Sequence, residues 1–208
     1  MNIRYAILRA TGKVCFNLFG RFEVKGLEGV PPRGRLLIVA NHLSNADPPV
    51  LVVSIPRRFW FVAKRGLFRH PISAYFMRIF SHPMDRSGQD AETLRWMLRM
   101  LEDEQTIGIF PEGTRSQGPM KKAGHGVAYV ALKSQATILP VGIVGTQKAQ
   151  NVWRIIFPFR RFKVIIGQPF SLPPIDGNVD TPVLESLTDL IMGRVAALLP
   201  KEYRGVYG

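Results

Sequence analysis

The chain has 208 residues, and no linker, repeat or low-complexity tract separates its motifs, which argues against a multidomain array and favours one domain with a sizeable core. It carries 28 Lys and Arg residues against 15 Asp and Glu residues, and the resulting formal net charge of +13 indicates a partner with an anionic surface. Cys15 is its only cysteine, which agrees with a reducing compartment.

Residues 1–22 form a basic N-terminal segment that lacks acidic residues and carries many apolar side chains. Arg4, Arg9, Lys13 and Arg21 interrupt it, whereas a membrane-spanning helix needs about 20 predominantly apolar residues. It also lacks the unbroken apolar stretch and the cleavage site of a signal peptide. We therefore expect an amphipathic helix that lies at a membrane interface, with a helix that packs on the following domain as the alternative.

Beyond this segment, short apolar runs alternate with helical periodicities. The strand-like runs are residues 36–40, 58–63, 106–110, 137–144 and 162–166. The helical patterns cover residues 91–102, 124–134 and 183–199. Such alternation predicts an α/β fold in which a mixed, largely parallel sheet is flanked by helices. We expect residues 23–208 to form this single domain.

Residues 41–47 (Asn-His-Leu-Ser-Asn-Ala-Asp) directly follow the first strand-like run, and strand ends commonly carry the sites of α/β sheets. The proton affinity of a histidine lies nearest neutral pH, so His42 is suited to act as a general base. Asp47 is suited to fix the tautomer of that histidine and to stabilise its imidazolium form. Positions five apart diverge by about 140° on a helix, so the two side chains converge only if the chain bends. Pro48 and Pro49 favour such a corner.

Both residues also have simpler interpretations. Asp47 before Pro48 matches a helix N-cap followed by proline at the first helical position. His42 matches a hydrogen-bonded structural histidine or a metal ligand. No metal site is expected, because the other histidines show no ligand spacing and Cys15 is the only thiol.

Residues 110–116 (Phe-Pro-Glu-Gly-Thr-Arg-Ser) begin at the end of the third strand-like run and form a second motif, which has the composition of a turn. Gly113 permits a tight turn with exposed backbone N–H groups, Thr114 adds a hydroxyl donor, and Arg115 supplies a planar fork suited to phosphate. The pattern predicts a phosphate-binding turn. The alternative is an ordinary surface turn in which Arg115 pairs with Glu112.

In this order, the two motifs closely resemble the first and third signature blocks of the glycerolipid acyltransferase family, whose best-known members are the lysophosphatidic acid (1-acylglycerol-3-phosphate) acyltransferases. Residues 80–87 resemble the second block, in which an arginine follows an apolar strand and an aspartate, although His82 and Pro83 interrupt the apolar run. Residues 139–143 resemble the fourth block, an apolar strand that carries a proline. The resemblance spans residues 22–170 and implies a glycerol-3-phosphate acyltransferase-like fold.

The resemblance implies transfer of a fatty acyl group from a thioester to the free hydroxyl of lysophosphatidic acid, by direct attack and without a covalent acyl-enzyme. His42 would deprotonate this hydroxyl, and Asp47 would orient and charge-balance the imidazole. The sequence has no Gly-x-Ser-x-Gly nucleophile elbow, which agrees with direct attack. The residues that would bind the acceptor's glycerol phosphate are Glu112, Gly113, Thr114 and Arg115, together with Lys64 and Arg86.

The implied partners are a lysophospholipid acceptor and an acyl thioester of coenzyme A or acyl carrier protein, which is a co-substrate, and we expect no further cofactor. Basic and aromatic residues interleave in residues 57–60 and 153–163, a pattern that fits an anionic phospholipid membrane surface. We therefore expect a peripheral or monotopic enzyme on the cytoplasmic face of the membrane, without a nucleic-acid partner.

Three alternatives stay open at this point. The first is an acyltransferase whose acceptor is glycerol 3-phosphate or another lysophospholipid. The second is a lipid esterase or thioesterase. The third is a basic module that binds membrane or nucleic acid. For Lys64, a solvated strand end is the alternative.

Overall fold

The structure of the protein is a computed structural model that describes residues 3–69, 71–84, 91–149, 151–156, 159–175, 177 and 179–208. The strands are β1 (Arg21–Lys25), β2 (Leu36–Ala40), β3 (Trp60–Lys64), β4 (Ser81–Met84), β5 (Thr106–Ile109), β6 (Thr137–Val144) and β7 (Arg161–Ile166). The α-helices are α1 (Ile3–Phe19), α2 (Asp47–Ser54), α3 (Pro71–Phe80), α4 (Ala91–Glu102), α5 (Gly126–Ser134), α6 (Val152–Ile156), α7 (Thr181–Ala196) and α8 (Lys201–Arg204). Short 3-10 turns are η1 (Leu27–Gly29), η2 (Arg65–Phe68) and η3 (Gly205–Tyr207).

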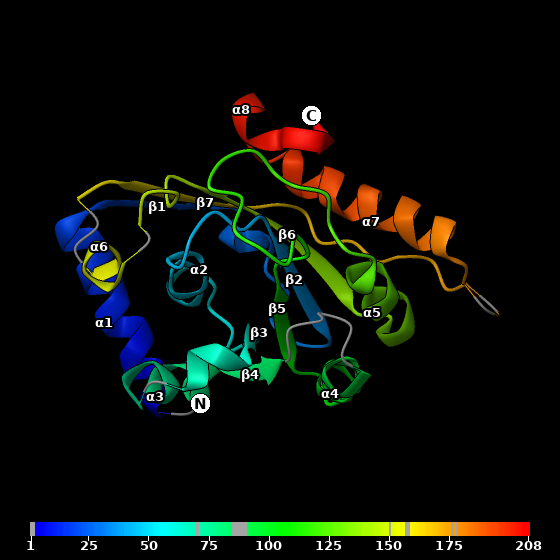
Figure 1. Ribbon diagram of the computed structural model, residues 1–208, viewed down its shortest axis with the longest axis horizontal. Coiled ribbons are helices and arrows are strands. Elements are labelled where there is room, and N and C mark those ends of the chain that lie inside the picture. The colour runs from blue at the N-terminus through cyan, green and yellow to red at the C-terminus, as the bar shows by residue number, and fades with distance from the viewer. Residues whose placement is uncertain are drawn as a thin grey trace.

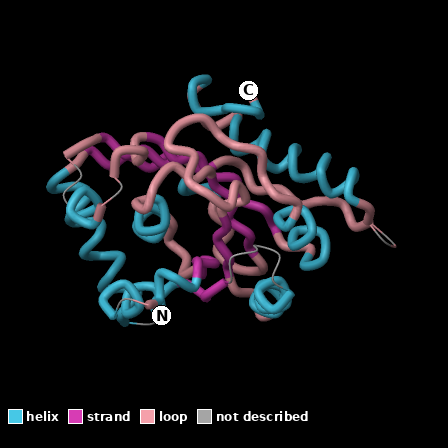
Figure 2. The backbone as a smooth tube through the Cα atoms, viewed as in Figure 1, coloured by secondary structure: helices cyan, strands magenta, loops and turns pink. Residues whose placement is uncertain are grey.

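The described strands form one seven-stranded sheet in the order β1-β7-β6-β2-β5-β3-β4, and helices cover both of its faces (Figures 1 and 2). All neighbours from β6 to β4 pair in parallel. At the other end, β7 pairs antiparallel with β6 and parallel with β1. The expected α/β fold with a mixed, largely parallel sheet is therefore confirmed.

The expected strands and helices match β2, β3, β5, β6, β7, α4, α5 and α7, with boundaries that differ by up to three residues. The strand-like and helical patterns did not include the two edge strands, β1 and β4, or the helices α3, α6 and α8, and for α2 they indicated only a helix start at Asp47 and Pro48. Edge strands are paired on one side only, so their side chains do not form a continuous apolar run; Pro83 in β4 is tolerated for the same reason. Helix α2 begins at Asp47 and continues through two prolines at its first turn.

Strand β2 lies at the centre of the molecule, and all of its side chains are buried. Successive side chains of a strand point to opposite faces, so β2 contributes to two cores. Leu36 and Ile38 pack on the face covered by α1 and α2, whereas Leu37 and Val39 pack on the face covered by α5 and α7. A strand buried on both faces holds its carboxyl end rigidly, and His42 follows that end.

Helix α1 presents two opposite apolar faces. Its inner face packs on the domain: Tyr5 and Phe16 are buried, and the Phe16 ring lies edge-on to Phe162 of β7 with centroids 5.8 Å apart. On the outer face, apolar side chains stay exposed within a sector of roughly 60° on the helix, given 3.6 residues per turn. These residues are Ile3, Ile7, Val14 and Leu18. Within the described part of the chain, no helix is both long and apolar enough to cross a membrane.

The parallel strands end at one edge of the sheet, and the predicted motifs gather there. His42 follows β2, Phe110 follows β5, and Thr146 follows β6 after one intervening residue. Lys64 is the last residue of β3. In register, β2 lies between β5 and β6, so the segments after these strands are neighbours in space although they are far apart in the chain.

Candidate active site

The chain bends between β2 and α2, and this bend brings His42 and Asp47 together. The Asp47 N–H donates to the Ser44 carbonyl at 3.3 Å, which closes a turn ahead of the helix. Nδ1 of His42 then lies 2.8 Å from Oδ2 of Asp47. The corner that the sequence pattern required is present, because the histidine stays outside the helix while the aspartate starts it.

Asp47 is fully buried, and hydrogen-bond donors surround its carboxylate. Oδ2 accepts the backbone N–H groups of Leu43 and Ser44 at 2.6 and 2.7 Å. Oδ1 accepts the hydroxyl of Thr146. Such donors stabilise the ionised form of a buried carboxyl group. Ala46, not Asp47, occupies the N-cap position, so the capping interpretation does not describe this carboxylate.

The imidazole of His42 is held by packing as well as by its hydrogen bond. It stacks on Phe110 with ring centroids 4.3 Å apart, and Phe110 stacks on Phe61 of β3. When neutral His42 donates its Nδ1–H to Asp47, Nε2 carries the lone pair. The side chain of His42 retains 17% of its accessible surface, whereas that of Asp47 retains 0%. The pair is therefore arranged as a buried carboxylate behind an imidazole with an outward face.

Glu112 connects the two motifs. Its Oε1 accepts the backbone N–H of His42 at 2.9 Å, and its Oε2 accepts that of Lys121 at 2.8 Å. Burial raises the pKa of this carboxyl group, and the two N–H groups oppose the rise. Both oxygens thus face the protein's own backbone, which gives Glu112 a bracing position between the His42 turn and the loop after the second motif. Its expected contact with the acceptor stays a prediction.

The second motif lies directly against the first. The N–H of Gly113 donates to the Phe110 carbonyl at 3.0 Å, and Gly113 has a φ of +63°, a conformation that favours glycine. The N–H and the hydroxyl of Ser116 both donate to the His42 carbonyl, at 2.7 and 3.2 Å. Together with Glu112, these bonds fix the His42 backbone on both of its sides.

Gly113, Thr114 and Arg115 face outward and are exposed. Arg115 donates to the Oδ1 of Asn45 at 2.9 Å. It therefore contacts the first motif, and the surface pair with Glu112 that the sequence also allowed is not formed. An exposed turn with a threonine hydroxyl and an arginine beside the His42 corner has the composition of an anion site.

Lys64 and Arg86 are the two other residues predicted to bind phosphate. Lys64 lies exposed at the carboxyl end of β3, at the same sheet edge as His42 and separated from β2 by β5. Its predicted contact with phosphate stays a prediction. Arg86 lies outside the described residues. Among the residues that are described, no group of His, Cys, Asp and Glu side chains is arranged to hold a metal ion.

Sequence reasoning missed two polar residues of the site. Thr146 is fully buried and reaches Asp47 across the end of β6. Asn41 is buried as well, and its amide both donates to and accepts from the backbone of Ile143 in β6. The signal was present for Thr146, because it is a polar residue just after a strand-like run, the same pattern that identified His42.

The C-terminal turn holds the loop that follows the second motif. The Tyr207 hydroxyl accepts the N–H of Ala123 at 2.8 Å, and the backbone of Met120 bonds to Tyr203 and Val206. Burial raises the pKa of the Tyr207 hydroxyl. Because this loop also presents the Lys121 N–H to Glu112, residues 203–207 support the brace behind His42.

Comparison with known proteins places this geometry in a family. The acyltransferase family profile matches residues 21–144, which include both motifs and the strands from β1 to β6. This chain belongs to the acyltransferase family. The membership predicted from the motifs is thereby confirmed, and with it the prediction that the protein is an acyltransferase enzyme.

Individual relatives of this acyltransferase carry more specific names. A 1-acyl-sn-glycerol-3-phosphate acyltransferase of Bacillus subtilis is 25% identical over 190 residues, which are 89% of this chain and 92% of that protein. One of Borreliella burgdorferi is 28% identical over 151 residues, 69% of this chain and 60% of that protein. The crystal structure of the 1-acyl-sn-glycerophosphate acyltransferase PlsC from Thermotoga maritima matches with a TM-score of 0.71 and 25% identity, over 90% of this chain and 76% of that one.

Proposed function

We propose that this acyltransferase moves a fatty acyl group from an acyl thioester to the free hydroxyl of lysophosphatidic acid and so forms phosphatidic acid. The observation that carries the proposal is the His42–Asp47 pair at 2.8 Å beside an exposed turn suited to bind phosphate. The relatives named as 1-acyl-sn-glycerol-3-phosphate acyltransferases support the choice of acceptor. Either coenzyme A or acyl carrier protein fits as the thiol of the donor.

In the proposed reaction, Nε2 of His42 takes the proton of the acceptor hydroxyl as its oxygen attacks the thioester carbonyl. The new C–O bond forms, the tetrahedral intermediate collapses, and the C–S bond breaks. The imidazolium then returns its proton to the departing thiolate, so no covalent acyl-enzyme forms. Asp47 stabilises the imidazolium during this cycle, because its buried carboxylate faces Nδ1.

The second motif has the role of positioning the acceptor. The guanidinium of Arg115 would bind the phosphate of lysophosphatidic acid, with Thr114 as a further donor, and Gly113, which has no side chain, lets the phosphate approach the turn closely. The bonds from Ser116 and Glu112 to the His42 backbone fix the distance between this turn and the base. A bound phosphate would thereby hold the acceptor hydroxyl near Nε2.

The outer face of α1 supports a peripheral position on a membrane. Its exposed Ile3, Ile7, Val14 and Leu18 form one stripe, and the exposed Trp153 and Phe159 lie on segments that contact α1. Apolar and aromatic side chains enter a bilayer interface, while basic residues face lipid phosphates. We propose that α1 lies in the interface plane on the cytoplasmic face.

The decisive experiment follows a radiolabelled acyl thioester with 1-acylglycerol 3-phosphate in mixed micelles. It compares the intact protein with His42→Ala and with His125→Ala, a matched histidine control outside the site. Labelled phosphatidic acid from the intact protein and the control, but not from His42→Ala, is the expected result. Free fatty acid as the only product would instead identify a hydrolase. If no product forms, lysophosphatidic acid is the wrong acceptor, and glycerol 3-phosphate and other lysophospholipids are then compared.

A further inference from the structure

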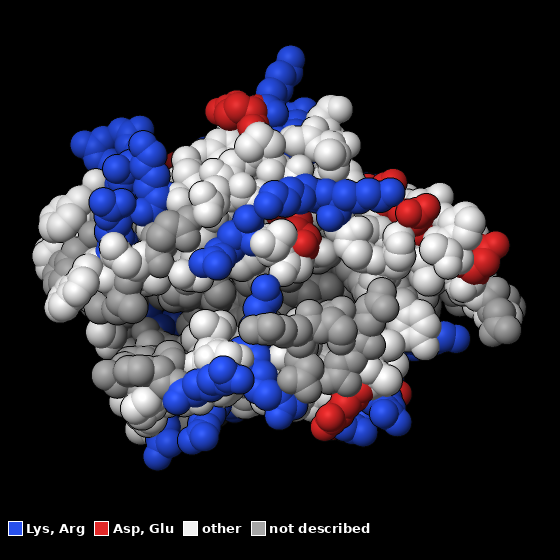
Figure 3. All heavy atoms as spheres, viewed as in Figure 1, with Lys and Arg blue, Asp and Glu red and all other residues white. Residues whose placement is uncertain are grey.

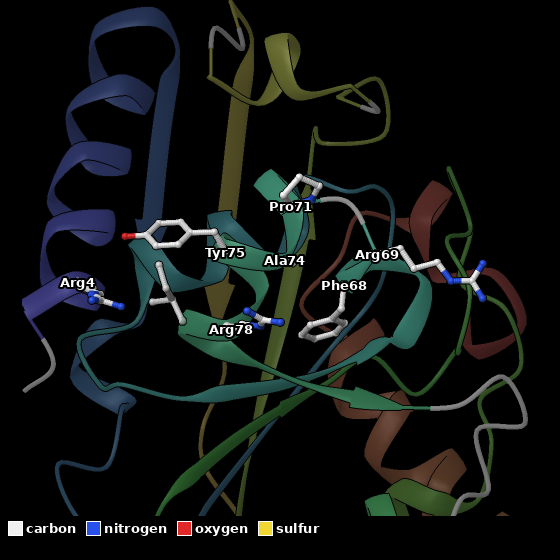
Figure 4. Close-up of a pocket in the computed structure, with 8 residues that line it drawn as sticks. Arg4, Phe68, Arg69, Pro71, Ala74, Tyr75 and Arg78 are labelled. Atoms are coloured by element: carbon white, nitrogen blue, oxygen red, sulfur yellow. The ribbon is translucent and has the colours of Figure 1, made fainter.

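A cavity of about 520 Å³ opens between the start of α1, the turn η2 and helix α3. Arg4 of α1, Arg69 just after η2 and Arg78 of α3 line it; in Figure 4, Arg4 and Arg78 lie on one side of Phe68, and Arg69 extends away on the other. Phe68 and Tyr75 supply apolar wall beside them. None of its lining residues belongs to the motifs around His42, so the proposed reaction leaves this cavity without a role.

The composition of the cavity selects for an anion. Its described lining residues include three arginines and no acidic residue. Guanidinium groups gathered in a concave site raise the local concentration of anions, and their planar fork fits the oxygens of a phosphate group. In Figure 3, basic side chains gather at the lower left, where Figure 1 places α3, and the acidic side chains of the lower edge lie further right, near α4.

The exposed apolar side chains around the cavity favour an anionic lipid headgroup over a soluble anion. Arg4 lies on α1 beside Ile3 and Ile7, which are 73% and 59% exposed. On the same rim, Tyr75 is 52% exposed and Leu67 is 48% exposed. A soluble phosphate ester gains nothing from exposed apolar side chains around its site. A lipid headgroup does, because these side chains enter the interface in which the headgroup lies.

We propose that this cavity binds the phosphate headgroup of an anionic membrane phospholipid that is not the substrate. Turn η2 begins directly after Lys64 at the carboxyl end of β3, the sheet edge that carries His42, whereas Arg78 precedes the amino end of β4, so the cavity extends along the β3–β4 side of the sheet. A headgroup held there, together with the exposed apolar side chains of α1, fixes how the protein sits on the bilayer, where a lysophospholipid acceptor resides. The inference goes beyond the proposed reaction and does not depend on it.

The test measures binding to phosphatidylcholine vesicles with and without phosphatidylglycerol. The triple variant Arg4→Gln, Arg69→Gln, Arg78→Gln is compared with Arg33→Gln, Arg95→Gln, Arg99→Gln, which has the same net charge. We expect the cavity variant to lose about fivefold in affinity for each arginine on phosphatidylglycerol vesicles, because a basic residue at an anionic surface contributes roughly that factor. The control variant should lose less than the cavity variant by about an order of magnitude. Equal losses in both variants would overturn the proposal, as would a cavity variant that binds like the intact protein.

Two further arms remove ambiguities. Arg78→Gln alone replaces one exposed side chain and serves if the triple variant has a lowered melting temperature; we expect about a fivefold loss on the same vesicles. Inorganic phosphate is then added against sodium chloride of equal ionic strength. Equal release by both salts supports a lipid headgroup, whereas stronger release by phosphate means that the cavity recognises free phosphate and contradicts the proposal. Binding to vesicles of phosphatidylcholine alone measures the contribution of the apolar face of α1, separately from that of the cavity.

Discussion

The two motifs of the site follow adjacent parallel strands, yet they differ in burial and in how many of their polar groups form hydrogen bonds within the protein. In the first motif, Asp47 is fully buried and each of its oxygens accepts hydrogen bonds from the protein. In the second, residues 113–115 are exposed, although the N–H groups of Gly113 and Ser116 donate to carbonyls of the protein. The difference teaches that the protein itself holds the proposed base in place, whereas the proposed phosphate turn leaves the side chains of Thr114 and Arg115 accessible to a ligand.

The largest expected effect tests the first motif, in which Asp47 is buried and hydrogen-bonded. Asn in place of Asp47 keeps an acceptor oxygen toward Nδ1 and the backbone N–H groups, but it removes the charge that stabilises the imidazolium. We expect kcat for acyl transfer to fall by about three orders of magnitude, within the range of general base catalysis and of comparable triads. Steady-state kinetics measure this. A variant that retains most of its kcat would show that Asp47 has a structural role only.

The next largest expected effect tests the second motif, in which Arg115 is exposed. Removing the guanidinium with Arg115→Ala should raise KM for lysophosphatidic acid about ten- to a hundredfold, since a hydrogen bond to a charged group contributes roughly 1.5–3 kcal/mol. The KM for the acyl thioester should stay the same. Lys at this position keeps the charge without the planar fork and should restore part of the loss. An unchanged acceptor KM and catalytic efficiency would exclude Arg115 from phosphate binding.

A smaller effect tests whether the support of Asp47 extends to β6. Thr146→Val preserves the shape of the side chain but removes the hydroxyl that donates to Oδ1. We expect kcat to fall about tenfold and the free energy of unfolding to fall by about 1–3 kcal/mol, because the buried carboxylate loses a donor. Thr146→Ser retains the hydroxyl and is the control. If Val and Ser behave alike in both assays, the hydroxyl does not support the carboxylate.

The smallest expected effect lies at the C-terminal support of the second loop. Tyr207→Phe removes the acceptor of the Ala123 N–H, so the free energy of unfolding should fall by about 0.5–1.5 kcal/mol. Because burial raises the pKa of Tyr207, its hydroxyl stays protonated in the folded state at pH values where the unfolded chain ionises. The folded state then binds more protons, so its stability falls as pH rises beyond about 10, the ordinary tyrosine pKa. The advantage of Tyr over Phe should therefore shrink in denaturation curves above that pH. An advantage that grows with pH would contradict the assignment.

The sequence patterns predicted much of this fold because the central strands are buried on both faces. Residues 36–40 and 137–144 are near-continuous apolar runs, and their observed bounds agree with the pattern. The edge strands β1 and β4 escaped prediction, since their pairing depends on neighbours that are distant in the chain. Thr146 follows a strand-like run, as His42 does, but this pattern does not reveal its partner, because its hydroxyl meets Asp47 only when β6 pairs with β2.

The sequence by itself determined the family, and it predicted the base, its carboxylate and the phosphate turn, because the residue types of the two motifs and their order suit that chemistry. Only the tertiary structure decided how each is held. The sequence could not show that Glu112 spends both oxygens on backbone N–H groups, or that Arg115 reaches Asn45. It also could not show that Arg4, Arg69 and Arg78 line one cavity. The contacts of Glu112 with His42 and of Arg115 with Asn45 join residues that are far apart in the chain, and the parallel pairing of β2 with β5 brings them together at one edge of the sheet.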